Sequence, residues 1–311
     1  MTHGATAILT GSAHSLAHVS LWALALGLGL HVLKLGAEAR AWHGIVRHAH
    51  DLHGIRFRLT LGAFVSAIGA SAVLPARVGE ALRVGVVRRH VPDSSAVTIA
   101  GTIVLETSIE VAFGAAMIAS FLIAGRSLGP HGSTPALSEL AAHHVLVGVG
   151  SCLAIAAVLL GVARREWLRA LGARMAKGFS IMRSPRAFAV RVLSWKLVAW
   201  SLRLASVYAF LLAFHVPVAP WTALAVVAAQ SVAASVPLLP GNAGTQQAAI
   251  GVALAGSASA AALLGFGVGM QSATTIADLI LGAVALTLVA GREDLRDALG
   301  ALRIRRATRA R

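Results

Sequence analysis

Long apolar runs alternate with short basic stretches along the chain. A helix that crosses a bilayer needs about 20 consecutive, mostly apolar residues. Runs of that length extend over about residues 16–36, 96–124, 145–163, 192–214 and 257–290. The pattern therefore predicts an all-α polytopic membrane protein with about five full spans.

Two further apolar segments, 59–87 and 221–256, are interrupted by proline and glycine. Proline removes a backbone donor and glycine permits left-handed backbone geometry, so a helix is expected to break where both occur. The predicted structural breaks are Pro75, Gly79, Pro240, Gly241 and Gly244. We therefore expect a broken or re-entrant helical hairpin in each segment.

The two breaks share one offset along the chain. A shift of 165 residues superposes three pairs of positions, which are Pro75 on Pro240, Gly79 on Gly244 and Glu106 on Gln271. This repeat predicts a single transmembrane domain, 1–311, made of four parts. They are repeat half 1 over about 16–124, a connector span and interfacial helix over about 145–190, repeat half 2 over about 192–290, and a basic cytoplasmic tail over 291–311.

Positive charge orients these segments in the membrane. Loops rich in Lys and Arg face the cytoplasm, and such residues concentrate in 37–58, 164–191 and 291–311. The N-terminus is then outside and the C-terminus is cytoplasmic. The number of spans between these cytoplasmic stretches then requires segment 59–87 to enter and leave the membrane on the cytoplasmic side, and segment 221–256 on the outer side.

Hairpins that enter from opposite sides predict an inverted-topology repeat. Broken helices that meet near the membrane midplane form the substrate sites of many transporters. Non-helical backbone at that depth has to be buried in protein or line a wet cavity. The alternative is that Pro75 and Pro240 lie at helix ends in ordinary loops.

Composition narrows the class of protein further. The chain is 57% hydrophobic and 13% charged, with a mean hydropathy of +0.77. No polar stretch is long enough to form a separate soluble domain, so any activity has to come from the membrane part. The net charge of +15 either serves contact with anionic lipid headgroups or reflects the positive-inside distribution alone.

The sequence contains no pattern typical of a cofactor, a metal or an activated nucleophile. Phosphate-binding glycine loops, nucleophile elbows and zinc signatures are absent, and the single Cys152 excludes an internal disulfide. The histidines at 43, 48, 50 and 53 have no recognised ligand spacing. We predict no cofactor, no metal and no nucleic-acid partner.

Three charged residues follow the first break. A charge at the centre of a membrane helix costs about 2.5–3.5 kcal/mol on insertion scales, so it has to be paired or face water. Glu80 and Arg83 are three residues apart and can pair on one helix face. Arg77 either binds an anionic group such as a lipid phosphate, which a guanidinium holds with two hydrogen bonds, or pairs with Glu106.

Two acids lie one turn apart in the third apolar run. Glu106 and Glu110 repel each other unless one is protonated or a cation lies between them. They serve either as a proton-coupling site or as counter-ions for Arg77 and Arg83, or else Glu106 lies nearer the boundary and faces water. Asp278 is a further acid in the last apolar run, so Glu110 and Asp278 are the candidates for coupling.

Two amides follow the second break. Gln246 and Gln247 either hydrogen-bond a lipid headgroup or satisfy backbone groups that the break leaves free. A helix that begins at Gly244 would present free backbone N–H groups suited to a phosphate. The predicted substrate-binding residues are therefore Arg77, Glu80, Arg83, Glu106, Gln246 and Gln247.

An amphipathic pattern marks the basic segment 164–190. Its apolar stripe consists of Trp167, Leu171, Met175, Phe179 and Met182, with Arg and Lys elsewhere. The stripe predicts either an interfacial helix on the inner leaflet or a helix packed on the protein's own underside.

Three of these motifs resemble one family. The segment from Leu74 to Arg83 resembles the Pro-Gly-Arg-x-Gly-Glu motif of the lysylphosphatidylglycerol synthase transmembrane-region family. The segment from Pro240 to Ala248 is similar to its Pro-Gly-Gly-x-Gly-x-Arg-Glu-Ala signature, and Glu106 to Glu110 to its Glu-Arg-x-x-Asp segment. Departures from these motifs are Ala76 for glycine, Thr107 for arginine and Gln246-Gln247 for Arg-Glu.

The resemblance implies a lipid flippase-like transporter of the bacterial inner membrane, acting on a phospholipid or another polar or anionic lipid. It implies a stand-alone member without the synthase domain. Expected partners are membrane lipids, with anionic headgroups, and a lipid-biosynthesis enzyme. The alternative function is a non-catalytic scaffold for such an enzyme; an intramembrane enzyme that uses Glu106 and Glu110 ranks lowest, so we expect no catalytic activity.

Overall fold

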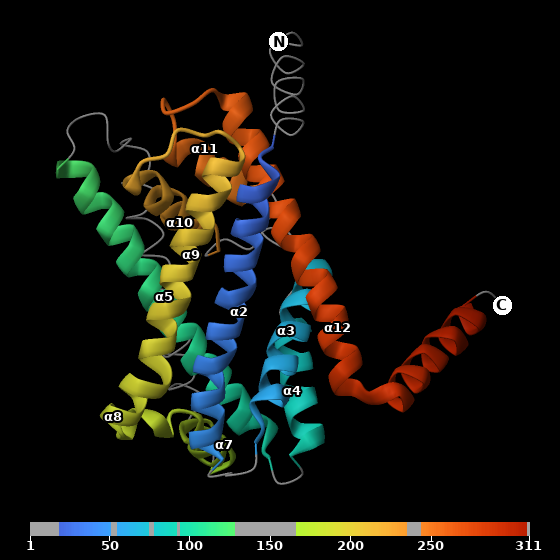
Figure 1. The fold of residues 1–311 in the computed structure, drawn as a ribbon. Helices are drawn as coiled ribbons and strands as arrows, with labels where there is room; N and C mark the ends of the chain where they lie inside the picture. Colours follow the sequence, from blue (N-terminus) through green and yellow to red (C-terminus); the bar gives the residue numbers. More distant parts are fainter. Residues whose placement is uncertain are drawn as a thin grey trace.

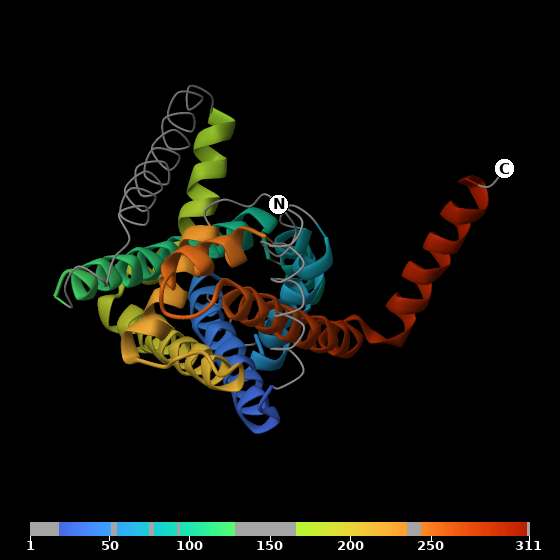
Figure 2. The ribbon, with the colours of Figure 1, turned by 90° about the horizontal axis from the view of Figure 1, so that it is seen from above.

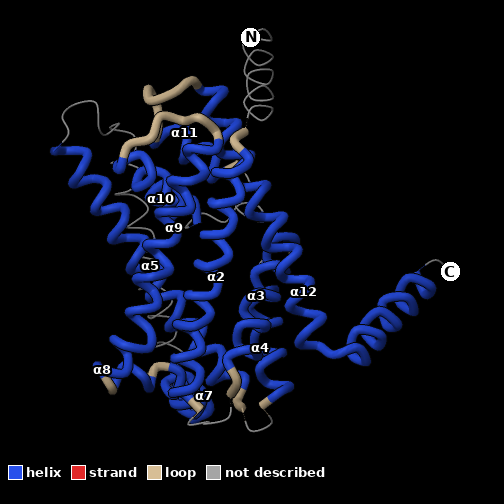
Figure 3. The backbone as a smooth tube through the Cα atoms, in the orientation of Figure 1, coloured by secondary structure: helices blue, strands red, loops and turns tan. Residues whose placement is uncertain are grey.

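The computed structural model describes residues 19–50, 55–74, 78–91, 94–127, 166–234 and 244–309. Within these ranges every regular element is a helix (Figure 3), so the predicted all-α class is confirmed. The longer helices are α2 (Leu21–Ala49), α3 (Phe57–Val73), α4 (Val78–His90), α5 (Ala96–Ser127), α7 (Glu166–Gly178), α9 (Ser194–Ala213), α10 (Pro220–Ala234), α11 (Thr245–Ala253) and α12 (Ala260–Arg309). The short ones between α7 and α9 are a 3₁₀ turn η1 (Ser180–Arg183), α8 (Pro185–Phe188) and a π-helical turn η2 (Ala189–Leu193).

Four helical stretches among the described residues are long and apolar enough to cross a membrane. They are Leu21–Ala49, Ala96–Phe121, Pro185–Ala213 and Ala260–Val289. These stretches correspond to four of the five predicted spans, and the fifth, 145–163, lies outside the described residues. Multi-pass membrane topology is therefore supported by the fold.

The first span is longer than its apolar run predicts. Residues 37–49, assigned from their charge to a cytoplasmic stretch, continue helix α2, and most of them are buried in protein. Lys34 and Glu38, one turn apart, form an ion pair with 3.5 Å between Nζ and Oε1. Pairing of this kind adds a little to helix stability, while burial of Trp42, Ile45 and Val46 against other helices stabilises the part of α2 beyond its apolar run.

Helices α2 and α9 form the centre of the bundle. They pack side by side in opposite directions (Figure 1). Ser206 on α9 donates to the carbonyl of Gly27 on α2 at 2.8 Å. Seen from above, α5 and α12 extend to opposite sides of this pair (Figure 2). The remaining helices therefore surround this central pair.

Two hairpins of shorter helices belong to the bundle, and α3 and α10 are their apolar members. The α3–α4 hairpin lies toward one end of the bundle and the α10–α11 hairpin lies at the other (Figure 1). Helix α3 ends at Val73 and α4 begins at Val78, while α10 ends at Ala234 and α11 begins at Thr245. The helix breaks are therefore where the sequence predicts them, although Pro75, Arg77, Pro240 and Gly241 lie outside the described residues.

The order of helices repeats along the chain. Helices α2, α3, α4 and α5 are matched in order by the stretch Pro185–Ala213 and by α10, α11 and α12. Each element of the second series begins 163 to 167 residues after its counterpart. This agrees with the offset of 165 residues, while the inverted membrane topology of the halves stays a prediction.

The two glycines after the breaks have different roles. Gly244 precedes α11 with φ of +85°, a left-handed conformation that glycine adopts without strain, as expected for a break. Gly79 was predicted as a break, and that prediction is wrong, because Gly79 is the second residue of α4. It is needed for packing: a Cβ at Gly79 would lie 2.2 Å from both the carbonyl oxygen of Ala67 and the hydroxyl of Ser71 on α3.

We expect Gly79→Ala to destabilise the protein by about 1–3 kcal/mol, because overpacking forces backbone shifts. The matched control is Gly85→Ala on the same helix, where a Cβ meets nothing within 4 Å. Replacement of an exposed helical glycine by alanine stabilises a helix by roughly 0.5–1 kcal/mol. Thermal unfolding of the purified variants in detergent should give a lower melting temperature than wild type for Gly79→Ala and a higher one for Gly85→Ala. Equal melting temperatures for the two variants would contradict the close α3–α4 contact.

Helix α12 packs against α3 through a backbone contact. A Cβ at Gly69 would lie 2.7 Å from the carbonyl oxygen of Asp278 and 2.8 Å from the Cα of Gly282. Small residues allow membrane helices to approach this closely. The first hairpin is therefore held directly against the last span.

Helix α7 is packed on the protein's own underside, which is one of the two arrangements its stripe predicts. A Cβ at Gly101 on α5 would lie 2.5 Å from the carbonyl oxygen of Met175, and the hydroxyl of Thr98 donates to the carbonyl of Arg174 at 3.2 Å. Further along the stripe, Phe179 packs against buried side chains while Met182 is exposed. The side chains of Trp167 and Leu171 lie outside the description.

Candidate functional site

A buried arginine on the first hairpin is the starting point of the site. Arg83 on α4 is 8% exposed, and its guanidinium carbon lies 3.9 Å from the ring centroid of Trp42 and 4.5 Å from that of Phe64. Cation–π attraction of this kind stabilises a desolvated guanidinium by about 2 kcal/mol. The Nη2 atom donates to Oε2 of Glu106 on α5, so Arg83 joins the hairpin to a span.

The two glutamates of α5 share a buried cation. Lys196 on α9 is completely enclosed, with its Nζ 3.4 Å from Oε1 of Glu106 and in contact with Oε1 of Glu110. The sequence leaves two ways to relieve the repulsion between Glu106 and Glu110, which are protonation of one carboxylate or a cation between them. The structure shows the cation. It also places Glu106 in the protein interior, and not at a boundary facing water.

Arg83, Glu106, Lys196 and Glu110, hereafter the charged cluster, contain two cations and two anions. Burial of such a group is costly, and it is sustained only when every charge has a partner. One donor is left over, because the buried Nε of Arg83 has no hydrogen-bond partner among the described residues. Arg83 can therefore donate one further hydrogen bond to an acceptor from outside the cluster.

Lys196 follows directly on an irregular turn. The π-helical turn η2 lies between α8 and α9, and Lys196 is in the first turn of α9. Insertions of this kind often occur at functional sites of helices. The sequence analysis missed Lys196 and Arg203, although the available signal was plain: both are cations inside the predicted apolar run 192–214.

Further charges extend the cluster across α2 and α9. Glu38, which pairs with Lys34, also interacts electrostatically with Lys196 and Arg203. Arg203 donates through Nη2 to Oε1 of Gln230 on α10 at 3.1 Å. Hydrogen bonds, ion pairs and the electrostatic interactions of Glu38 thus link residues of the first hairpin, through the central helix pair, to the second hairpin.

The second break forms a separate polar group. Oε1 of Gln247 accepts a hydrogen bond from the backbone N–H of Gly244 at 2.7 Å, and its Nε2 donates to Oε1 of Gln271 on α12. Gln247 thus hydrogen-bonds a backbone N–H group at the break, which is one of its two predicted roles, and it also connects α11 to α12. Gln246 is half-buried on α11, and the structure does not bring either amide to Arg83, since α11 and α4 lie at opposite ends of the bundle (Figure 1).

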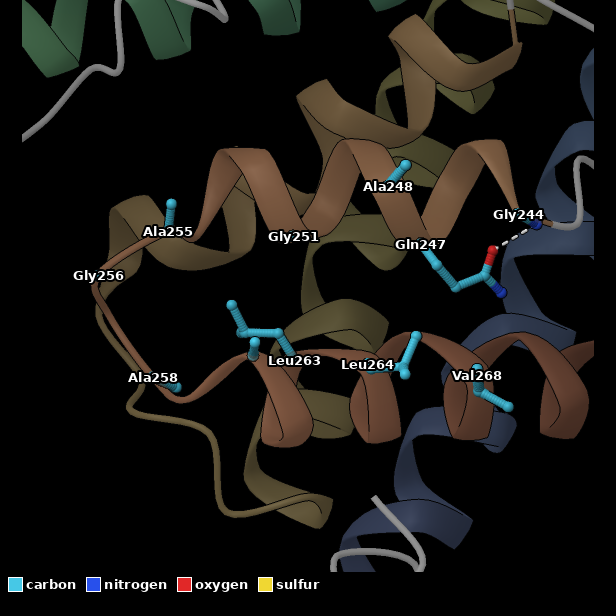
Figure 4. A pocket seen from close by; sticks show the side chains of 11 residues that line it. Gly244, Gln247, Ala248, Gly251, Ala255, Gly256, Ala258, Leu263, Leu264 and Val268 are labelled. Atoms are coloured by element: carbon cyan, nitrogen blue, oxygen red, sulfur yellow. Dashed lines mark hydrogen bonds between the residues drawn. The ribbon is translucent and has the colours of Figure 1, made fainter. Parts of the chain in front are cut away.

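A pocket opens between α11 and the beginning of α12. Its volume is about 820 Å³, and it is lined by small and aliphatic side chains such as Ala248, Leu263 and Val268. Gln247 supplies its polar end and points into the space between the two helices (Figure 4). The pocket therefore combines an apolar wall with one amide, next to a helix N-terminus.

The remaining candidates are placed as follows. Glu80 lies in the first turn of α4 and is half-buried. Asp278 lies on α12 and pairs with His31 on α2, with 2.9 Å between Oδ1 and Nε2; His31 was not among the sequence candidates. Arg77 lies outside the described residues.

The histidines of α2 do not form a metal site within the described part of the chain, where no group of three or more His, Cys, Asp or Glu residues could hold an ion. Buried His43 shares a hydrogen bond of 2.9 Å with the hydroxyl of Thr60. Burial lowers the pKa of His50, at the end of α2, and the nearby Lys177 lowers it further.

The fold and the charged cluster together define a multi-pass helical membrane protein with ionisable groups inside its spans. The family model of the lysylphosphatidylglycerol synthase TM region matches residues 9–282. The chain belongs to this family, as its three motifs indicate, and membership indicates a lipid-related, flippase-like membrane domain. No match was found among the curated proteins or among the solved structures.

Proposed function

We propose that the protein is a bacterial inner-membrane lipid transporter that moves a phospholipid or another polar or anionic lipid between leaflets. The observation that carries this proposal is the charged cluster. Glu106, Glu110 and Lys196 lie within candidate spans, where each charge is costly. Ionisable residues at such depth mark substrate or ion pathways in membrane proteins.

Arg83 is the proposed headgroup ligand. A guanidinium can bind a phosphate with two parallel hydrogen bonds. Arg83 has an unused Nε donor, so a lipid phosphate can bind there and replace Glu106 at Nη2. Glu106 then keeps Lys196 as its partner, so the exchange leaves no glutamate unpaired.

The two hairpins are the proposed moving parts. We propose that the halves form an inverted-topology repeat, with the α3–α4 hairpin entering from the cytoplasm and the α10–α11 hairpin from outside. In transporters of this design one repeat rocks against the other around a fixed site. Ion pairs and electrostatic interactions from Arg83 through Arg203, with the hydrogen bond from Arg203 to Gln230, would connect the hairpins. Gln246 and Gln247 would bind uncharged parts of a headgroup.

Leaflet-resolved lipid movement in liposomes tests the proposal. The purified chain is reconstituted with labelled phosphatidylglycerol or aminoacylated phosphatidylglycerol, and wild type is compared with Arg83→Gln. Loss of a hydrogen bond to a charged group costs about 1.5–3 kcal/mol, so we expect movement roughly 10- to 150-fold slower in the variant.

The matched control is Arg88→Gln, because Arg88 lies on the same helix and is exposed. It should transport like wild type. Equal rates for Arg83→Gln and Arg88→Gln, at equal reconstitution, would contradict a headgroup site at Arg83. Arg77→Ala tests the other arginine of the motif in the same assay.

A scaffold role is the second candidate function. The supporting observation is α7, which is packed on α5 and leaves Arg174 and Lys177 exposed. These exposed cations would form a docking surface for a lipid-biosynthesis enzyme. Transport by the purified chain alone would exclude a purely scaffolding role. Absence of transport, with co-purification of an enzyme that Arg174→Glu abolishes, would favour it.

A further inference from the structure

A second intramembrane ion pair lies apart from the charged cluster. Nε2 of His31 on α2 is 2.9 Å from Oδ1 of Asp278 on α12, and the two side chains are 12% and 17% exposed. Asp278 is the single ionisable residue in the stretch from Ala260 to Val289. An acid and a histidine in contact within membrane spans are the elements from which proton pathways of pumps and transporters are built.

Glu38 on α2 links this pair electrostatically to the charges of neighbouring helices. His31 and Lys34 on α2 both interact electrostatically with Glu38, which also interacts with Lys196 and Arg203 on α9. Lys196 in turn contacts Glu106 and Glu110 on α5, and Glu106 accepts a hydrogen bond from Arg83 on α4. Other helices also pack on α2 and α12. Among them, α11 has no ionisable residue and α3 has Arg58 in its first turn. The basic residues of α7, η1 and η2 lie near the predicted cytoplasmic end.

The charges of this network balance only if His31 is neutral. Its cations are Lys34, Arg83, Lys196 and Arg203, and its anions are Glu38, Glu106, Glu110 and Asp278. One proton on the His31–Asp278 pair therefore leaves the network with a single excess positive charge. In an interior of low dielectric constant such an excess acts over several ångströms and favours an anion.

Helix α12 connects this pair to both hairpins. Seven residues before Asp278, Gln271 accepts a hydrogen bond from Gln247 on the second hairpin. Four residues after it, Gly282 touches the backbone of Gly69 on the first hairpin, where the carbonyl of Asp278 also lies. A change of charge at Asp278 therefore occurs between the two contacts through which α12 holds the hairpins.

We infer that His31 and Asp278 form a proton-binding site that couples the binding of one proton to the binding of one anionic lipid headgroup. This inference rests on the proposed transport function. One proton from water binds to the pair, whose charge changes from −1 to 0, and is released again when the lipid leaves. Since linkage is reciprocal, the proton strengthens binding of the anion and the anion strengthens binding of the proton.

Proton uptake on lipid binding tests the site without transport. Phosphatidylglycerol is added to the detergent-solubilised chain in weakly buffered solution with a pH-sensitive dye, and zwitterionic phosphatidylcholine is the control lipid. We expect wild type to take up protons with phosphatidylglycerol only. Asp278→Asn, which keeps an acceptor for His31, should abolish this uptake, and Asp278→Glu should retain it.

Liposomes then test the coupling to movement. An imposed pH gradient should accelerate phosphatidylglycerol movement by wild type and by Asp278→Glu, while Asp278→Asn should move lipid at its zero-gradient rate in both conditions. Equal proton uptake in wild type and Asp278→Asn, or equal responses to the gradient, would overturn the inference. Lipid movement by wild type without a gradient is a separate test of the proposed transport function. The coupling inference can therefore fail while the transport function stands.

Discussion

Lys196→Met is expected to destabilise the folded protein by about 3–5 kcal/mol, the cost of removing one partner from a buried ion pair. Lys196 is fully enclosed and contacts both Glu106 and Glu110. Methionine has a similar length but no charge, so the two glutamates would face each other without a cation between them. Thermal unfolding in detergent and the amount of folded protein recovered from membranes would measure the loss.

Removal of the surplus acid should reverse much of this loss. In Lys196→Met combined with Glu110→Gln, the remaining Glu106 still accepts from Arg83, and the charges balance again. Replacement of both partners of a buried pair by neutral groups is often close to neutral. A double variant no more stable than Lys196→Met would show that Lys196 has a role other than balancing these carboxylates.

Trp42→Ala should have an effect of similar size, a loss of about 3–5 kcal/mol, as for other large aromatic residues in packed interiors. Trp42 is completely buried, its Nε1 donates to the hydroxyl of Thr102 at 3.2 Å, and its ring covers the guanidinium of Arg83. Truncation removes the packing and exposes one face of Arg83, so transport is expected to fall with stability.

Trp42→Phe separates the two roles of this ring. Phenylalanine keeps an aromatic face for Arg83 but cannot donate to Thr102, so the stability loss should be about 1 kcal/mol, one hydrogen bond. Transport per folded molecule should then stay near wild type. A stable Trp42→Phe variant that no longer transports would show that the hydrogen bond to Thr102, and not the ring face, positions Arg83.

Local sequence patterns were sufficient for much of the architecture. Apolar runs define three of the four described spans within several residues at each end, since hydrocarbon thickness sets helix length. The interruptions between α3 and α4 and before α11 were predictable because proline and glycine act locally on the backbone. The end of the first span was less predictable: α2 continues to Ala49, and Trp42, Ile45 and Val46 in its last part are buried against other helices, which is what stabilises most helices in proteins.

The site could be predicted only in part. The rule that membrane charges need partners identified Arg83, Glu106, Glu110 and Asp278 as residues to explain. It could not name their partners, because Lys196 lies 86 residues from Glu110 and His31 lies 247 from Asp278. Gly79, predicted as a break, proved to be a packing residue, because only the path of α3 shows that a Cβ has no room.

By itself, the sequence determined that the chain is a helical membrane protein, that it has two interrupted segments in a repeat of about 165 residues, and that it belongs to a family of lipid-related membrane domains. These properties follow from hydrophobic length, local backbone preference and short motifs, which are all read along the chain. Only the tertiary structure decided which charges neutralise one another and which glycines are contact points. Pairing in a helical bundle depends on how distant helices face each other, and the energy of each buried charge is set by that arrangement.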